Sequence, residues 1–261
     1  MEGEPHGEPT KVLPTAAARQ EPRPPERRSS QHWTNPAYYD MPACVDTSPQ
    51  IRPYEPRDRA AVRQICSDTA DAGQPIERFF PDREVFADLL TNYYTQFESQ
   101  SAFVADNAGE VIGYVTGCLD TKRFVRLMTW RIAPTIFVKA LLRGTLWHPQ
   151  TVRLVRANIG LWLKAGHRTG PTLDNYPAHL HVNLRQGFRG QRLGHRLVET
   201  FCERARTAGV HGVHAGVSAE NPRARHFFEE LGFTELHREP RMRKPNGSGE
   251  ILYTVICAKK L

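Results

Sequence analysis

The residues from Asn183 to Gly194 read N-L-R-Q-G-F-R-G-Q-R-L-G and are followed by H-R-L-V-E. This order predicts a short apolar strand that passes through a glycine-containing turn into a helix. The first N–H groups of a helix have no partner inside it, and the helix dipole favours an anion at that end. The stretch therefore has the residue types of a phosphate-binding turn, although similar turns in many α/β proteins bind nothing.

A second stretch, from Asn221 to Phe233, reads N-P-R-A-R-H-F-F-E-E-L-G-F. Asn221 is a favourable N-cap, Pro222 suits the first helical position, and Gly232 suits the end of a helix. The pattern predicts a short, capped amphipathic helix. The cap alone would explain Asn221, but the two stretches together are more informative than either one.

Together these stretches resemble the GNAT superfamily of acetyl-CoA-dependent N-acetyltransferases. The loop motif of that family, Gln/Arg-x-x-Gly-x-Gly/Ala, is similar to residues 189–194, except that Arg192 stands where the first motif glycine usually stands. The later helix commonly reads N-x-x-A-x-x-F-Y-x-x-x-G-F, and here Phe228 replaces the tyrosine. Residues 176–181, Y-P-A-H-L-H, resemble bacterial-type members. In element order the resemblance spans residues 51–261.

The resemblance implies an α/β (α+β) fold with a mixed, mostly antiparallel central sheet flanked by helices, and a helical insertion before the central cofactor-binding strand. The residues agree with this expectation. Ile51–Tyr54 predicts an edge strand, Asp58 the cap of a helix that runs through Cys66, and residues 82–97 a second helix. Further strands are predicted over 101–105, 111–118, 178–184, 212–217, 233–237 and 251–256.

The resemblance also implies how acetyl-CoA would bind as a co-substrate. The strand that ends at Leu184 would separate from the next strand at a bulge, and the main chain of Asn183, Leu184 and Arg185 would pair with the pantetheine amides. The diphosphate would lie on the backbone of Arg189, Gly190, Gln191, Arg192, Leu193 and Gly194, and Asn221 would contact the pantetheine arm. Arginine at position 192 is tolerable if its backbone is near the right-handed α conformation.

The implied reaction is attack of a neutral amine on the acetyl carbonyl, with release of the CoA thiolate. His181 is the first candidate for the base and His179 the second, because their strand would line the thioester site and a histidine pKa lies near working pH. An ordinary structural role is also compatible with either histidine. Alternation along residues 178–184 predicts that both histidines share one face with Asn183. Because Phe228 has no hydroxyl, the general acid is unassigned.

Residues 121–173 form a segment with ten basic residues and no Asp or Glu. Apolar residues recur at helical spacing on both sides of residues 144–149, which predicts two amphipathic helices around a turn. The insertion is compatible with a lid beside the acceptor cleft, a patch that attracts phosphates, an ordinary solvated face, or weak contact with an anionic membrane surface. Nucleic-acid binding is not expected, because no recognised module accompanies the charge.

Composition predicts one domain, residues 49–261, behind a disordered tail of residues 1–48 that is rich in Pro, Glu, Arg, Ser and Ala. The first residues, M-E-G-E-P, do not resemble a secretory signal, and no apolar run approaches the ~20 residues of a membrane span. The five cysteines include no C-x-x-C spacing and predict neither a disulfide framework nor a metal site. We expect a soluble, cytoplasmic protein without a bound metal.

These observations predict an N-acetyltransferase that moves an acetyl group from acetyl-CoA to a primary amine by direct attack on the thioester. The alternative is a catalytically inactive acyl-CoA-binding or protein-interaction module on the same scaffold. Aminoglycosides, polyamines, amino sugars, amino acids and protein amines all stay open as acceptors. The basic insertion mildly favours a small or anionic amine, because it would repel a polycation.

Overall fold

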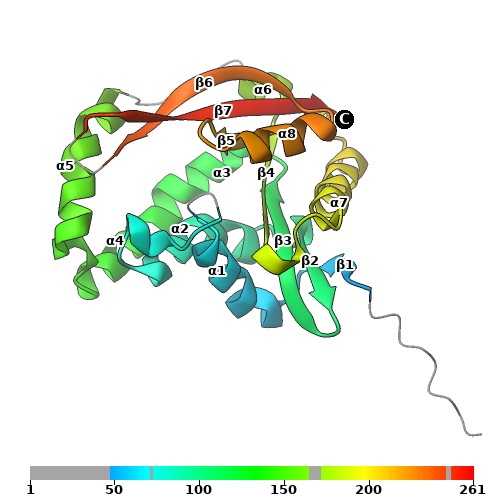
Figure 1. Cartoon of the computed structure of the whole chain (residues 1–261), viewed down its shortest axis with the longest axis horizontal. Coiled ribbons are helices and arrows are strands. Elements are labelled where there is room, and N and C mark those ends of the chain that lie inside the picture. The colour runs from blue at the N-terminus through cyan, green and yellow to red at the C-terminus, as the bar shows by residue number, and fades with distance from the viewer. Residues whose placement is uncertain (1–47, 71–72, 165–171, 245–247) are drawn as a thin grey trace, which may run out of the picture. The chain divides into compact units, whose positions relative to one another are not determined.

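The computed structural model describes residues 48–70, 73–164, 172–244 and 248–261, whose strands form one seven-stranded sheet (Figure 1). The strands are β1 (Gln50–Pro53), β2 (Ala102–Asn107), β3 (Glu110–Cys118), β4 (Ala178–Leu184), β5 (Gly212–Ser218), β6 (Thr234–Arg243) and β7 (Ile251–Lys260). Their order is β1-β2-β3-β4-β5-β7-β6, and every neighbouring pair is antiparallel except β4 and β5. The expected mixed, mostly antiparallel sheet is confirmed. Residues 1–47 of the expected tail lie outside the described residues.

Helices cover both faces of the sheet. They are α1 (Arg59–Asp68), α2 (Arg83–Gln96), α3 (Thr121–Leu127), α4 (Ala133–Leu142), α5 (Pro149–Lys164), α6 (Thr172–Asn175), α7 (Leu193–Thr207) and α8 (Pro222–Glu230). Short turns of 3₁₀-helix are η1 (Pro56–Asp58), η2 (Ile76–Arg78), η3 (Ser99–Ser101), η5 (Thr145–Trp147) and η6 (Gln186–Phe188), and η4 (Met128–Ile132) is a π-helix. α7 and α8 share a core with β3, β4, β5 and β7, whereas α1, α2 and α4 pack in two separate clusters.

The first two helices begin in different ways. At α2 the side chain of Asp82 accepts hydrogen bonds from the N–H groups of Glu84 and Val85, both at 3.1 Å, as an N-cap should. At α1, Asp58 occupies the N-cap position as expected, but its side chain makes no capping hydrogen bond. The Asp58 carboxylate turns instead to the guanidinium of Arg52, at 2.7 and 2.8 Å, because that charged partner binds it more strongly than a helical N–H group.

The insertion contains the two helices that the sequence predicts. The first is longer than expected, because α3, η4 and α4 are continuous from Thr121 to Leu142. A π-helical turn accommodates one extra residue in such a helix and rotates the residues on either side of it. The second helix is α5, and η5 fills the predicted turn between them.

Gly117 on β3 lies against the Phe201 ring of α7. A Cβ at this position would lie 2.4 Å from the Phe201 ring and 2.5 Å from the His179 carbonyl. We therefore expect Gly117→Ala to lower the free energy of unfolding by about 1–3 kcal/mol, because neither neighbour has room to move in a packed core. Chemical denaturation followed by circular dichroism measures this change.

Gly160 on α5 provides the matched control. It is exposed, and a Cβ there would meet no atom within 4 Å. Gly160→Ala should leave stability unchanged or raise it by up to about 1 kcal/mol through helix propensity. Equal losses in the two variants would contradict the packing argument.

Candidate functional site

β4 and β5 are paired at one end only. Their parallel ladder consists of Ala178 with Val213 and His179 with His214. β5 nevertheless stays paired with β7 along its whole length, and β4 stays paired with β3 as far as Leu184. The strands therefore diverge after His179, which leaves one edge of β4 without a partner strand. The β3–β4 ladder has no register shift, so the bulge expected in β4 is absent and the separation comes from diverging strand directions.

Alternate residues of β4 direct their main chain toward this open edge. The N–H of Arg185 donates to the carbonyl of Ile112 on β3, at 2.9 Å. In an extended strand the N–H and C=O groups of one residue point to the same side, and this side alternates from residue to residue. The main-chain groups of Asn183 and Arg185 therefore face β3. Val182 and Leu184 face the open edge. Of the three residues predicted to pair with pantetheine, only Leu184 presents its main chain there, together with Val182, which the prediction did not include.

Six consecutive backbone N–H groups follow this strand without a hydrogen-bond partner in the described part of the chain. They belong to residues 190–195, between η6 and the first turn of α7. The first bond into α7 runs from the N–H of Arg196 to the carbonyl of Arg192, at 3.1 Å, whereas the N–H of Arg189 is already taken by Gln186. Unpaired donors at a helix N-terminus favour an anion. The donors expected for a phosphate are therefore free at residues 190–195.

Two residues of this turn have left-handed backbone conformations. The φ angles are +86° at Gly190 and +57° at Arg192. The expectation of a right-handed backbone at Arg192 is therefore wrong, and this arginine carries the cost of about 1–2 kcal/mol that a side chain pays in the left-handed region. Left-handed Arg192 followed by helical Leu193 makes successive N–H groups converge on one concave site. The same conformation explains the preference of the motif for glycine at this position.

The guanidinium of Arg189 lies at the open edge of β4. Its Nε and Nη2 both donate to the carbonyl of Leu184 at 3.3 Å. Within the described residues no carboxylate pairs with it. Burial lowers the pKa of Arg189, and the neighbouring charge of Arg223 lowers it further. A partly buried cation without a counter-ion is well suited to accept an anion.

His179 is buried, and both of its ring nitrogens are engaged. Nε2 lies 2.7 Å from the hydroxyl of Tyr94, and Nδ1 lies 2.8 Å from the hydroxyl of Thr121. Thr121 donates its proton to the carbonyl of Pro177 at 2.8 Å, and the Sγ of Cys118 lies 3.1 Å from Nδ1 of His179 as a further partner. Burial lowers the pKa of His179 well below 6.5. This arrangement supports the structural role for His179.

His181 lies on the same face of β4 but is exposed, and its ring nitrogens make no hydrogen bond to any described residue. The ring centres of Tyr94 and His179 lie 5.6 and 5.7 Å from its own, at steep angles. Desolvation by the surrounding protein, with a smaller contribution from His214, lowers the pKa of His181 to about 4. The imidazole is therefore neutral at pH 7 and free to accept a proton.

Three other residues from the sequence prediction have structural partners. Asn183 donates to the hydroxyl of Tyr114 at 2.8 Å and accepts from Thr69 at 3.0 Å, so its side chain ties α1 to the sheet. Asn221 accepts from the N–H of Ala224 at 3.0 Å and caps α8 as predicted. Phe228 is buried between the rings of neighbouring phenylalanines. No hydroxyl is available at this position of α8.

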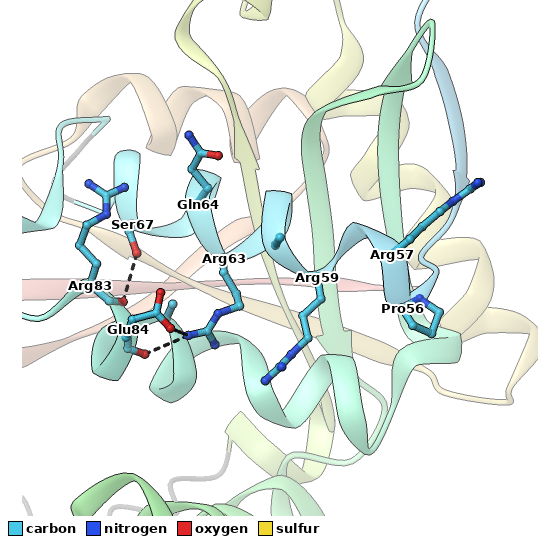
Figure 2. Close-up of a pocket in the computed structure, with 10 residues that line it drawn as sticks. Pro56, Arg57, Arg59, Arg63, Gln64, Ser67, Arg83 and Glu84 are labelled. Carbon is cyan, nitrogen blue, oxygen red and sulfur yellow. Dashed lines mark hydrogen bonds and ion pairs between the residues drawn. The ribbon is translucent and has the colours of Figure 1, made fainter. Parts of the chain in front are cut away.

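A cavity of about 530 Å³ lies elsewhere, along the outer side of α1 and the start of α2 (Figure 2). None of its lining residues belongs to β4 or to the turn before α7. Its arginines are largely neutralised, since Arg63 pairs with Glu84 at 2.6 Å and Arg83 pairs with Glu77 at 2.8 Å. This cavity is therefore separate from the site that the free N–H groups define.

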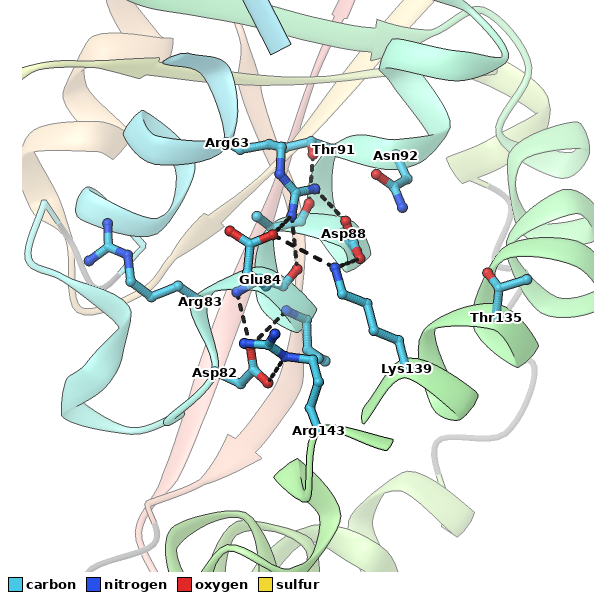
Figure 3. Close-up of polar contacts among 12 residues, drawn as sticks. Arg63, Asp82, Arg83, Glu84, Asp88, Thr91, Asn92, Thr135, Lys139 and Arg143 are labelled. Atoms are coloured by element: carbon cyan, nitrogen blue, oxygen red, sulfur yellow. Dashed lines mark hydrogen bonds and ion pairs between the residues drawn. The ribbon is translucent and has the colours of Figure 1, made fainter. Parts of the chain in front are cut away.

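Ion pairs fix the first helix of the insertion to α2 (Figure 3). Lys139 of α4 contacts Asp88 at 2.6 Å, and Arg143 contacts Asp82 at 2.7 Å. Burial alone would raise the pKa of Asp82, but the bonds from Arg143 and Thr145 outweigh it and lower that pKa to about 2. Two of the ten basic residues of the insertion therefore serve as structural ties rather than as a free positive patch.

The second helix of the insertion is fixed to β6. Asn158 is fully buried, and its Nδ2 donates to the carbonyl of Arg243 at 3.1 Å while its Oδ1 accepts from the N–H of the same residue at 2.5 Å. An amide side chain thus pairs with strand backbone much as a neighbouring strand would. The insertion consequently connects α2, which packs beside β3 inside the sheet, to β6, which is an edge strand.

The described residues contain neither a metal-binding cluster nor a membrane-spanning helix. No group of three or more His, Cys, Asp or Glu side chains there is close enough together to hold a metal ion. Likewise, none of the described helices has the length and apolar character needed to cross a membrane.

A protein-family model and several solved structures match this chain. A model of the acetyltransferase (GNAT) family matches residues 165–233. The crystal structure of SsHAT is 31% identical in sequence, with a TM-score of 0.63, and the match covers 82% of this chain and 98% of that chain. An N-acetyltransferase from Staphylococcus aureus Mu50 shares the fold at 13% identity and a TM-score of 0.51, covering 81% of this chain and 98% of that chain. A GNAT superfamily phosphinothricin acetyltransferase from Sinorhizobium meliloti, in complex with acetyl-CoA, shares the fold at 15% identity and a TM-score of 0.50. That match covers 82% of this chain and 88% of that chain.

Three histidines with lowered pKa values predict a pH dependence of stability. The pKa values of His179, His181 and His214 are all lowered from 6.5 in the folded chain. The unfolded chain therefore binds more protons as pH falls below 6.5, and stability must fall with it. Thermal unfolding should move to lower temperature between pH 6.5 and 5, above the range where the carboxylates titrate. In an NMR titration, the His181 ring should show a midpoint near 4.

His181→Gln separates this effect from general acid sensitivity. Because His181 is exposed, the variant should fold, and its melting temperature should depend less steeply on pH in the same interval. Gly160→Ala, which changes no titrating group, should keep the slope of the wild-type protein. A wild-type melting temperature that is flat from pH 6.5 to 5 would contradict the lowered pKa values.

Proposed function

This chain belongs to the acetyltransferase (GNAT) family, and on that premise we propose that it moves the acetyl group of acetyl-CoA to a primary amine by direct attack of the amine on the thioester. The observation that carries this proposal is the row of six unpartnered N–H groups at residues 190–195, next to the open edge of β4. Acetyl-CoA supplies the activated acetyl group when bound. The proposed catalytic domain is residues 49–261.

The cofactor-binding residues fit a ligand that carries a diphosphate and an amide-containing arm. Residues 190–195 offer donors to the phosphates, and Arg189 and Arg192 add positive charge beside them. The main chain of Val182 and Leu184 offers partners to amides. For Leu184 to serve in this way, Arg189 has to release its carbonyl, and a phosphate is a stronger partner for the guanidinium than a carbonyl is.

His181 is the proposed base. Its imidazole is neutral at pH 7, is exposed, and lies on the strand whose other residues face the open edge. A pKa of about 4 makes it a weak base. It therefore suits removal of a proton from a nitrogen that has become acidic through acylation, rather than from a free ammonium ion. Tyr94 and His179 hold the position of the ring on its inner side.

Departure of the thiolate requires no protein acid in this scheme. Phe228 cannot donate a proton, and the hydroxyl of Tyr94 is directed at His179. A CoA thiolate is a comparatively good leaving group, so water is the proposed proton source. For the acceptor we propose a small or anionic primary amine, because exposed arginines of the insertion such as Arg123 and Arg126 disfavour a polycation.

Gly190→Ala tests the phosphate-binding turn. At a φ of +86° an alanine is strained by about 1–2 kcal/mol, so the turn should rearrange and its N–H groups should lose their alignment. CoA binding measured by calorimetry should weaken by roughly 5- to 30-fold. Gly187→Ala is the matched control, since a Cβ there meets no atom within 4 Å and its φ is not positive, and it should bind CoA like the wild type. Wild-type protein that fails to bind CoA would overturn the proposal.

His181→Gln tests the base. The expected result is a fall in kcat of roughly 10²- to 10⁴-fold, with CoA affinity unchanged, because general base catalysis contributes about this much. Release of free thiol from acetyl-CoA in the presence of a panel of small amines measures the rate. His226→Gln should retain full activity. If His181→Gln keeps its rate while His226→Gln does too, His181 is not the base, even though the turn still binds CoA.

A further inference from the structure

The continuous helix from Thr121 to Leu142 is apolar on two opposite sides, and only one side is covered. Ile132, Ile136 and Ala140 are buried in the cluster that contains Tyr93 of α2. The other side also carries apolar residues, but they are exposed. A helix that is apolar all round is normally buried, so the second side calls for a partner.

We name this second side the outer stripe, and it consists of Trp130, Pro134, Phe137, Val138, Leu141 and Leu142. Spacings of three and four residues place Pro134, Phe137, Val138, Leu141 and Leu142 on one side of α4, and Trp130 lies about one turn earlier, in η4. Trp130 is 81%, Phe137 59% and Leu142 82% exposed. Trp147, in η5 directly after the helix, is 72% exposed. The outer stripe is therefore a long apolar ridge that begins at an exposed tryptophan.

The same helix carries positive charge that no described carboxylate neutralises. Arg126 lies one turn before Trp130, in line with the outer stripe, and Arg123 lies nearly one turn earlier. Both are exposed and neither forms an ion pair with a described residue, in contrast to Lys139, which Asp88 holds on the covered side. No acidic residue occurs between positions 121 and 164. Cationic and apolar groups thus occupy successive parts of one exposed surface.

We propose that the outer stripe, together with Arg123 and Arg126, adsorbs to the surface of an anionic phospholipid bilayer. The apolar half of the helix lies below the headgroups, Trp130 lies at the interface, and the two arginines contact lipid phosphates. This binding mode requires no membrane-spanning helix. It locates the acetyltransferase at a membrane surface and is independent of which residues carry out catalysis.

Charge distinguishes a bilayer from a second copy of the chain as the occupant. In either orientation, two outer stripes packed face to face would leave Arg123 and Arg126 without a counter-charge, because the helix has no acidic residue to offset them. Anionic lipid neutralises the same charges. Tryptophan at the border between apolar and charged residues is also the arrangement typical of a membrane interface.

Vesicle binding of the full-length chain tests this proposal. The protein should co-sediment with vesicles of phosphatidylcholine that contain phosphatidylserine, and tryptophan emission should shift to shorter wavelength as Trp130 leaves water. Binding to pure phosphatidylcholine should be at least about tenfold weaker, and high salt should release the protein from the anionic vesicles.

Paired variants separate the two contributions. Phe137→Ser with Leu141→Ser removes apolar area from the outer stripe. Arg123→Gln with Arg126→Gln removes charge, and the loss of each arginine should weaken vesicle affinity by about fivefold. Both double variants should fold, since all four side chains are exposed, and both should bind anionic vesicles at least about tenfold more weakly. Arg204→Gln with Arg206→Gln on α7 changes the net charge equally at a distance from α4 (Figure 1) and should change binding by less than about twofold.

Three results would overturn the proposal. The first is failure of the wild-type chain to bind anionic vesicles. The second is an equal loss of binding in the α7 control, which would indicate diffuse charge rather than this surface. The third is a dimer, seen by light scattering, that dissociates in the Phe137→Ser and Leu141→Ser variant while vesicle binding is absent, which would assign the outer stripe to a second copy.

Discussion

Main-chain polar groups without partners gather where β4 ends, and the rest of the structure is arranged around them. A buried N–H or carbonyl without a partner is costly, so a sheet that opens between two strands must satisfy or solvate the groups it exposes. Here the turn at residues 190–195 follows the open edge of β4 closely in sequence. Arg189 satisfies one carbonyl of that edge. The remaining donors are the basis of the binding function that we propose.

The opening between β4 and β5 divides the sheet into two halves, β1 to β4 on one side and β5, β7 and β6 on the other, and disrupts neither. β4 keeps its ladder with β3, and β5 keeps its ladder with β7, so the lost pairing is confined to one pair of strands. α7 fills the core behind both halves with Leu197, Val198 and Phe201. Because Gly117 has no side chain, the Phe201 ring can lie directly on β3. Close packing on one face thus supports an opening at the edge of one strand.

The helical insertion connects the two halves of the sheet, because it is attached both to α2 and to β6. Ion pairs from α4 to Asp82 and Asp88 connect it to α2, and Asn158 of α5 connects it to the backbone of β6. Because both connections are partly or fully buried, the insertion is a fixed part of the domain rather than a detached lid. This attachment also determines which residues of its first helix are covered and which form the outer stripe.

Much of this could be predicted from local sequence. The glycine turn before α7, the capped α8, the alternation of β4 and the two helices of the insertion all depend on near neighbours in the chain, whose propensities and spacing act whatever the tertiary structure. The resemblance to a known family likewise rested on short motifs. Asp58 is the exception among the caps, since a charged partner on β1 competed for its carboxylate.

Residues 179 and 181 show where local sequence stops. Both are histidines on one face of one strand, and the sequence treats them alike. Only packing decides that Tyr94 and Thr121, from distant segments, engage both nitrogens of His179 while His181 stays open to water. The left-handed backbone of Arg192 and the choice of Val182 over Arg185 at the open edge depend in the same way on contacts between segments. The sequence by itself determined the elements and their order, whereas the tertiary structure decided which polar groups are left without partners, because partners come from anywhere in the chain.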